Sequence, residues 1–500
     1  MTLRTRTVNA VKWSTFSFVI NALLTPVFAA ILARLLTPAQ FGVVALGMAL
    51  YLLGQFLADL GVGPALVQKK ELTPQHVHSA FGSSVLLGLL VTALGWFTAP
   101  LAGQYFHNPD VVTVFRGFSL TYLPLTLTGV AANLLRRDLR FRAMMVIDTT
   151  SYIVGHGLFG LGSAYLGYGA TSLVISVIAQ NVILLSCTMF LTRRQFGLAF
   201  HWSAMRELYS FGGMVSVVTL LEYFSSSLDT FLVGRFYNVT SLGLYNSAYR
   251  TVCTPLLSFT RSMTRVLASS FSAAQDQQER LRRAYLTGVQ TLSVLTCPIA
   301  VGVLICAPEI VHVLLGPRFA GSVPIMQVFA MYIPFMVLTN ISGVISQATA
   351  RLGAKIVIQS LYLVGIGAGF LLVHRLGLPV ISFAAVLAVA SALRWAGYMV
   401  VVERIIGGGL GNVVRSNLSG VLPSIVVGVP LFLAVLGLRA AHTPLALLFV
   451  TELLLGGGLM LLVVLNGPET EAKRMIQGGL RRVQTRLGRG AAPTTDLHGR

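Results

Sequence analysis

A few charged side chains interrupt long apolar stretches of this chain, and these are the residues that could do chemistry. Arg250 and Arg394 each lie well inside an apolar stretch. Glu222 and Asp229 are seven residues apart, so a helix would present both carboxylates on one face. An arginine can hold oxyanions with its planar fork and keeps its charge. A carboxylate pair can hold a proton or Na⁺, or can neutralise a nearby arginine. These residues are therefore candidates for binding an anion and for balancing or coupling charge.

The elements that position these charges follow from composition. The 500 residues are 55% hydrophobic and only 10% charged, whereas soluble proteins carry about 25% charged residues. The apolar runs are about 20 residues long, which suits helices that cross a bilayer. They lack the strict alternation of a membrane β-barrel, and spanning backbone must satisfy its own hydrogen bonds. We therefore predict an all-α polytopic membrane protein with about 14 transmembrane helices.

The predicted transmembrane segments fall into two sets of six and a final pair. Their expected boundaries are 14–36, 41–60, 80–101, 116–135, 143–166 and 169–191, then 209–234, 242–265, 284–306, 323–347, 355–374 and 377–401, and last 418–438 and 444–465.

The net charge of +20 is explained by topology. If the N-terminus is cytoplasmic, 28 of the 36 basic residues fall on the cytoplasmic side. This asymmetry obeys the positive-inside rule and predicts that both termini are cytoplasmic. Nucleic-acid binding is not needed to explain the charge. The basic residues expected on the outer side are Arg34, Arg235, Arg318, Arg375 and Arg439.

A short motif occurs twice at an offset of 201 residues. Arg34 and Gly42 in ILARLLTPAQFGVVA match Arg235 and Gly243 in LVGRFYNVTSLGLYN. Six crossings precede segment seven, so both halves begin on the same side and form two parallel six-helix repeats plus two C-terminal helices. We expect an N-terminal lobe at 1–200, a C-terminal lobe at 201–403, two additional helices at 404–465, and a basic, disordered cytoplasmic tail at 466–500.

Other functional classes find less support in the sequence. The apolar run at the N-terminus continues to Leu36, which favours an uncleaved first helix over a secretory signal. The four cysteines lie singly in apolar segments and read as small core residues. There is no phosphate-binding loop of the G-x-x-x-x-G-K-[ST] type, and every predicted outer loop is short. An enzyme is therefore not expected, and neither a cofactor nor a metal is predicted.

Three stretches carry a resemblance to a known family. ARLLTPAQFGVVAL at 33–46, DLGVGPALVQKKEL at 59–72 and SLGLYNSAYR at 241–250 are typical of it, and the likeness covers most of residues 1–400. The chain resembles the Wzx-type polysaccharide flippases, in the exopolysaccharide branch of colanic-acid and xanthan-type exporters, within the multidrug/oligosaccharidyl-lipid/polysaccharide transporter superfamily. The first segment lacks the Arg-Asp pair of lipid II flippases and offers only Asn21 and Arg34, which favours that branch.

The resemblance implies a function. Such proteins move undecaprenyl-diphosphate-linked oligosaccharide from the inner to the outer leaflet of the bacterial plasma membrane, by alternating access around a cationic cavity. The implied partners are this lipid-linked oligosaccharide, membrane lipids, and a polysaccharide polymerase with its export machinery. A cation-coupled exporter of small amphiphilic molecules, of the multidrug type, is the alternative. A structural or enzymatic partner of a polysaccharide synthase is a further one.

Each candidate site residue has a functional and a structural interpretation. Arg250 would contact substrate in the cavity, or would pair with an acid of segment seven. Arg394 would assist from the inner side or extend its charge towards the cytoplasm. Arg34 and Arg235 would gate the outer mouth or complement helix C-termini. The acids Glu222 and Asp229 would balance Arg250 or couple an ion, and Asp148 would pair with an arginine such as Arg137 or Arg140. Glu452 lies outside the repeated core and receives no role.

Overall fold

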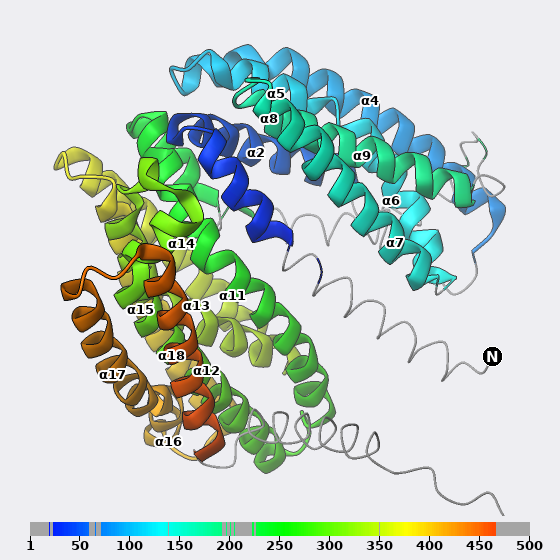
Figure 1. Cartoon of the computed structure of the whole chain (residues 1–500). Coiled ribbons are helices and arrows are strands. Elements are labelled where there is room, and N and C mark those ends of the chain that lie inside the picture. The colour runs from blue at the N-terminus through cyan, green and yellow to red at the C-terminus, as the bar shows by residue number, and fades with distance from the viewer. Residues whose placement is uncertain are drawn as a thin grey trace, which may run out of the picture. The chain divides into compact units, whose positions relative to one another are not determined.

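The structure is a computed structural model, and it describes residues 20, 24–59, 66, 72–138, 140–192, 197, 201, 205, 223–224, 227–349 and 351–466. Within these ranges every regular element is a helix (Figure 1). Ten of the described helices are long and apolar enough to cross a membrane. The prediction of an all-α, polytopic membrane protein is therefore confirmed.

The ten spanning helices coincide with predicted segments. They are formed by α2 (Pro38–Asp59), α4 (Pro74–Tyr105), α5 (Asp110–Ser119) with α6 (Tyr122–Arg137), α9 (Thr171–Thr192), α12 (Gln278–Ile310), α13 (Ser322–Ala348), α14 (Leu352–Arg375), α15 (Ile381–Ile406), α16 (Leu410–Asn417) with α17 (Val421–Ala440), and α18 (Leu445–Asn466). The fifth predicted segment is α7 (Phe141–Tyr152), η1 (Ile153–Leu161) and α8 (Gly162–Tyr165), and the eighth is α11 (Val239–Ala273). Of the first segment, the apolar helix Leu24–Leu35 is described.

The chain packs into two compact units. The first contains Met1–Thr251, Leu314–Ser322 and Phe370–Phe383, and the second contains Val252–Val313, Val323–Gly369 and Ala384–Arg500. These packing units do not follow the repeat boundary, because the start of α11 packs with the first unit. The lobe boundaries expected from the sequence stay predictions. The predicted disordered tail lies outside the described residues apart from Asn466.

In the first unit, small residues allow close helix packing. One face of α4 is a stripe of glycine, alanine and serine that includes Gly88 and Gly95, and α4 packs against α5 and α6 there. A Cβ at Gly95 would lie 2.8 Å from the Cβ of Ser119. The opposite face carries exposed large side chains such as Phe97, which is 78% exposed. Soluble proteins bury large apolar side chains, whereas here the small residues are buried and the large ones are exposed. This arrangement is expected where lipid covers the surface and helices associate through small residues.

The fifth segment changes its helical winding in the middle. The residues IVGHGLFGL of η1 form a π-helix between the α-helical turns of α7 and α8. Gly155 and Gly160 lie against Gln180 and Ser176 of α9, too close for a side chain on the glycines. His156 and the Gln180 side-chain oxygen are 3.0 Å apart. The glycines thus admit the wide turns and let α9 approach.

In the second unit, the two C-terminal helices pack on α12. Both α17 and α18 contact α12 and each other, and they lie side by side in Figure 1. The joint between α16 and α17 is held by Ser293 of α12, whose hydroxyl donates to the Asn417 carbonyl at 2.6 Å and accepts from the Gly420 N–H at 3.0 Å. The last two helices therefore pack as an integral part of this unit.

Candidate functional site

The two copies of the repeated motif meet in space. The helices α2 and α11 begin at equivalent positions, after Thr37 and Asn238, whose side chains accept hydrogen bonds from the N–H groups of Gln40 and Ser241 at 3.3 and 2.8 Å. One turn later Gly42 of α2 and Gly243 of α11 lie backbone to backbone. A Cβ at either glycine would lie 3.0 Å from the backbone nitrogen of the other. The repeat is thus a structural symmetry as well as a sequence one.

Of the two matched arginines, Arg235 has a defined environment. Its guanidinium carbon lies 5.2 Å from the centre of the Tyr105 ring, and its Nη1 contacts the ring nitrogens of His107. The Arg34 side chain is exposed and has a contact of its own. The structure therefore brings Arg235 to the end of α4.

An apolar pocket of about 520 Å³ extends from Tyr105 between α2, α4, α5 and the chain at 224–232. We call it the apolar pocket; its walls include Leu53, Leu94, Phe106 and Phe231. Tyr105 belongs to the lining of this pocket, and Arg235, which contacts the Tyr105 ring, is a cation next to the pocket. Such a combination suits an amphiphile with an anionic head.

A second hollow, which we call the polar pocket, lies near the other end of this helix group. It has a volume of about 220 Å³ and is lined by Gln55, Asn133, Arg136 and Asp148, among others. Arg136 donates to the Asn133 side-chain oxygen at 3.2 Å. Arg136 is the cation whose charge acts on Asp148. Arg137, one of the partners expected for Asp148, donates to the carbonyl of Leu66 at 3.0 Å.

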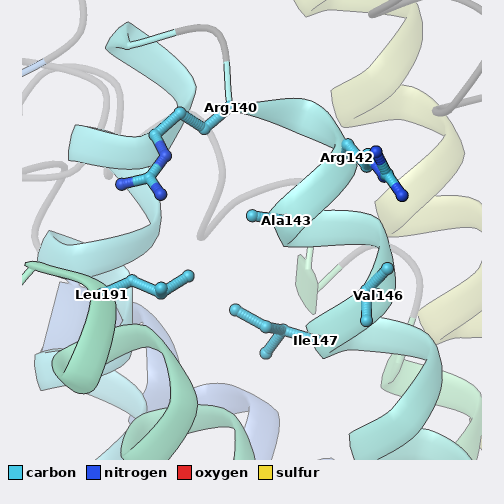
Figure 2. Close-up of a pocket in the computed structure, with 6 residues that line it drawn as sticks. All are labelled: Arg140, Arg142, Ala143, Val146, Ile147 and Leu191. Atoms are coloured by element: carbon cyan, nitrogen blue, oxygen red, sulfur yellow. The ribbon is translucent and has the colours of Figure 1, made fainter.

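The third hollow is the basic pocket. Arg140 and Arg142 line it together with Ala143, Val146, Ile147 and Leu191, and its volume is about 510 Å³. In Figure 2 the Arg140 side chain extends toward Leu191, the Arg142 side chain extends away from it, and Val146, Ile147 and Leu191 supply the aliphatic part of the lining. Both arginines flank the start of α7, at the loop that the charge asymmetry places on the cytoplasmic side. Two basic residues beside an aliphatic surface at the predicted cytoplasmic side are suited to the neighbourhood of anionic lipid.

Of the two acids predicted in segment seven, the structure describes Asp229. Glu222 lies outside the described residues. Asp229 is buried, and its Oδ2 accepts a hydrogen bond from the Tyr245 hydroxyl at 3.0 Å while its Oδ1 accepts one from the Thr230 N–H at 2.7 Å. The structure therefore holds Asp229 with neutral donors and does not bring it into an ion pair with Arg250.

Arg250 is the charge that the sequence singled out first. Its side chain is exposed, although it lies inside α11 near the buried residues Ala248 and Val252. Within the described ranges Arg250 makes no ion pair or hydrogen bond through its side chain. An arginine without an acid on a membrane helix is chemically able to receive an anion.

Arg394 is held by its neighbours on α14. Its guanidinium carbon lies 3.9 Å from the centre of the Tyr362 ring, and its Nη1 is 3.5 Å from the side-chain oxygen of Gln359. Its Nε is buried and has no hydrogen-bond partner in the described part of the chain. A cation stacked on an aromatic face is stabilised there by the ring. Arg394 thus has a structural contact in addition to its predicted role.

Sequence reasoning missed one charged pair. Glu309 is buried and accepts hydrogen bonds from Arg439 Nε and Nη2, both at 2.8 Å. The predicted ninth segment ended at residue 306, whereas α12 continues to Ile310 and a π-turn follows as far as Leu315. Glu309 therefore seemed to be a loop residue. The signal that could have found it is the apolar stretch that resumes directly after it, VHVLL at 311–315.

The fold defines a multi-pass membrane protein with one apolar pocket and two pockets whose lining includes arginines. The chain belongs to the polysaccharide biosynthesis protein family, whose model matches residues 31–324. Among its relatives is the lipopolysaccharide biosynthesis protein WzxC of Escherichia coli (strain K12). It is 22% identical over 353 residues, which are 70% of this chain and 72% of WzxC.

Two solved structures share the fold. The lipid II flippase MurJ in an inward closed conformation aligns with 92% of this chain and 98% of its own, with a TM-score of 0.70 and 12% identity. An inward-facing multidrug resistance transporter of the MATE family aligns with 78% of this chain and 94% of its own, with a TM-score of 0.63 and 15% identity. At these identities the likeness concerns the fold alone.

Proposed function

We propose that this protein is a flippase that moves undecaprenyl-diphosphate-linked oligosaccharide repeat units from the inner to the outer leaflet of the bacterial plasma membrane for exopolysaccharide synthesis. Its membership of the polysaccharide biosynthesis family and its similarity to WzxC support a role in polysaccharide assembly. The fold that it shares with MurJ supports transport of a lipid-linked substrate. We infer that it acts as a transporter and not as an enzyme.

The single observation that carries this proposal is the basic pocket. A lipid-linked diphosphate has an anionic head and a long apolar tail, and moving the head through hydrocarbon is costly because its polar groups lose water. Arg140 and Arg142 offer positive charge next to the aliphatic side chains of Val146, Ile147 and Leu191 (Figure 2). Each basic residue near an anionic lipid surface contributes about 1 kcal/mol of attraction. The pocket would therefore gather the substrate from the inner leaflet.

The later steps use the other arginines. Arg250, which is accessible and has no acid partner among the described residues, would contact the diphosphate or the glycan. Arg394 would assist it from the inner side, and Arg34 and Arg235 would serve the outer mouth. The apolar pocket next to Arg235 is suited to the lipid tail near the end of the path. Glu222, Asp229 and Asp148 would balance these charges or couple an ion.

Alternating access requires a contact that closes one side. The backbone contact of Gly42 with Gly243 joins the first helices after each repeated motif, at their predicted outer ends. We propose that this contact closes the outer side and that the two termini are cytoplasmic. A polysaccharide polymerase and its export machinery would then take the substrate from the outer leaflet.

The decisive measurement is the leaflet distribution of lipid-linked oligosaccharide in cells that lack this gene. We expect accumulation on the cytoplasmic leaflet and loss of polymer, both restored by the wild-type gene. Normal delivery to the outer leaflet would overturn the proposal. If susceptibility to small amphiphiles changed instead, the multidrug-type alternative would replace it. Flipping that persists without the protein would favour a partner of the polysaccharide synthase.

The role of the basic pocket is tested by complementation of the same cells. The double variant Arg140→Ala/Arg142→Ala is expected to reduce delivery, whereas the exposed Arg415→Ala, a cation of the same predicted side, should restore it fully. Protein levels must be equal in the three strains. Equal delivery by both variants would remove the basic pocket from the mechanism, and the flippase assignment would then rest only on the family match and on the fold.

A further inference from the structure

The C-terminal helix pair contains a buried acid, Glu452, that has no role in the proposed transport path. Glu452 lies two turns into α18 and is 4% exposed. Helix α18 packs against α12 and α17, so the three helices enclose this carboxylate. The cost of burying a charged carboxylate in apolar surroundings is large unless it is paired. The groups around Glu452 decide whether it is paired.

The neighbouring cation is already engaged. Arg439 of α17 holds both carboxylate oxygens of Glu309 of α12, with its Nε and Nη2 each 2.8 Å from an oxygen. Its Nη2 also lies 3.1 Å from the carbonyl oxygen of Ile305. This two-pronged geometry is the strongest that an arginine offers to a carboxylate. The positive charge of Arg439 is thus committed to Glu309.

Glu452 receives no comparable support. Both of its carboxylate oxygens are buried, and neither has a hydrogen-bond partner among the described residues. The charged and titratable groups that face it are Glu309 and Cys306 from α12 and Arg439 from α17. The thiol of Cys306 is buried and belongs to an apolar cluster with Leu431 and Val435. Glu452 therefore has a second carboxylate, a thiol and aliphatic side chains as its surroundings.

The charges of this cluster do not balance. Two carboxylates and one guanidinium leave one negative charge in an apolar environment, and that charge is on Glu452, whose neighbouring donor is the weakly polar Cys306 thiol. A bound proton would remove it. A metal ion is a poorer solution, because hard cations need several oxygen ligands and the described residues contain no group of three or more metal-binding side chains close enough to share an ion.

We propose that Glu452 is a proton-binding site of the C-terminal helix pair, occupied by a proton while Arg439 is paired with Glu309. Binding converts the carboxylate and one proton from solution into a neutral carboxylic acid, and no other reactant is consumed. Release requires that α17 and α18 shift on α12 so that water or Arg439 can stabilise the carboxylate. The Arg439 side chain is 40% exposed and marks the route to solvent. In the predicted topology this route opens on the outer side.

Dicyclohexylcarbodiimide tests the proposal, because it enters apolar sites and reacts with protonated carboxyl groups. The full-length protein in lipid nanodiscs would be treated at several pH values and the labelled peptides identified by mass spectrometry. We expect labelling of Glu452 at neutral pH that falls as the pH rises. Glu279, which is paired with Arg282 and Arg283 on the surface, serves as the ionised control and should stay unlabelled.

Variants separate proton binding from a structural ion network. Glu452→Gln mimics the protonated acid, so its thermal stability at neutral pH should equal that of the wild type. Arg439→Gln removes the cation that is paired with Glu309, so dicyclohexylcarbodiimide should then label Glu309 as well as Glu452. A folded wild-type protein without label at Glu452, protection of Glu452 by Na⁺ at constant pH, or marked destabilisation by Glu452→Gln would each overturn the proposal. None of these readouts involves the glycan, so they stand or fall separately from the flippase assignment.

Discussion

Gly42 and Gly243 contact each other backbone to backbone, and each also lies against a carbonyl of the other helix. A Cβ at Gly42 would overlap the Val239 carbonyl oxygen, and a Cβ at Gly243 would overlap the Pro38 carbonyl oxygen. Pro38 and Val239 are themselves separated by 201 residues, as the two glycines are. The contact is therefore two-fold symmetric, and neither position has room for a side chain.

Replacing either glycine should disrupt this contact. Gly42→Ala is expected to destabilise the described state by about 1–3 kcal/mol, the usual cost of overpacking against groups that cannot move away. Thermal unfolding of the purified protein measures the effect. Gly129→Ala in α6 is the matched control, because a Cβ there would meet nothing within 4 Å. That control should leave stability unchanged or raise it slightly.

The double variant tests whether the two glycines share one contact. If Gly42→Ala already separates the helix starts, adding Gly243→Ala should cost much less than the sum of the single changes. Fully additive effects would contradict a shared contact. Because we assign this contact to closure of the outer side, Gly42→Ala should also lower the delivery of lipid-linked oligosaccharide in complemented cells.

Arg250 should be required for transport and not for folding. Arg250→Ala removes a charge that has no partner among the described residues, so protein level and thermal stability should stay near those of the wild type. Loss of a hydrogen-bonded charge contact with a phosphate costs about 1.5–3 kcal/mol, which corresponds to a reduction in transport of roughly ten- to a hundredfold. Arg280→Ala, a change at an exposed arginine, is the control. Normal delivery by Arg250→Ala would exclude substrate contact by this residue.

Arg394 and Tyr362 should show energetic coupling. The 3.9 Å stacking predicts an interaction of about 0.5–2 kcal/mol in a double-mutant cycle of Arg394→Met and Tyr362→Leu, measured by unfolding in mixed micelles. Tyr362→Leu keeps the positive charge of Arg394, so transport per folded molecule should not change. Arg394→Met removes that charge and should lower transport per folded molecule. Equal transport per folded molecule in both variants would limit Arg394 to its contact with the ring.

Asp148 should act through the polar pocket. Asp148→Asn leaves Arg136 without its acidic neighbour and is expected to reduce transport, while stability changes by no more than about 1 kcal/mol because the Arg136 side chain is solvent-exposed. Asp138→Asn changes an exposed acid of the same region and serves as the control. The added variant Arg136→Gln should restore part of the lost transport. If the double variant is worse than Asp148→Asn alone, the two residues do not balance one another.

The sequence alone determined the class of protein and the positions of its helices. A low charge content and apolar runs of about 20 residues leave lipid as the only suitable environment, and both signals are local properties of the chain. The match of Gly42 with Gly243 was also readable as a sequence repeat, whereas their contact was decided by the tertiary structure. The lengths of α2, α9 and α18 follow from the same patterns, whereas α4 extends beyond the predicted 80–101 at both ends.

Only the tertiary structure decided which charges meet. The sequence suggested Arg137 or Arg140 as a partner of Asp148, and the helix packing places Arg136 in the same pocket as Asp148. Sequence reasoning could not see that Asp229 would be held by Tyr245, or that Glu309 would join Arg439 from a helix 130 residues away. The reason is physical: apolar periodicity fixes how long a membrane helix is, but the rotation and depth of each helix depend on how it packs. A charge finds its partner only after that packing has formed.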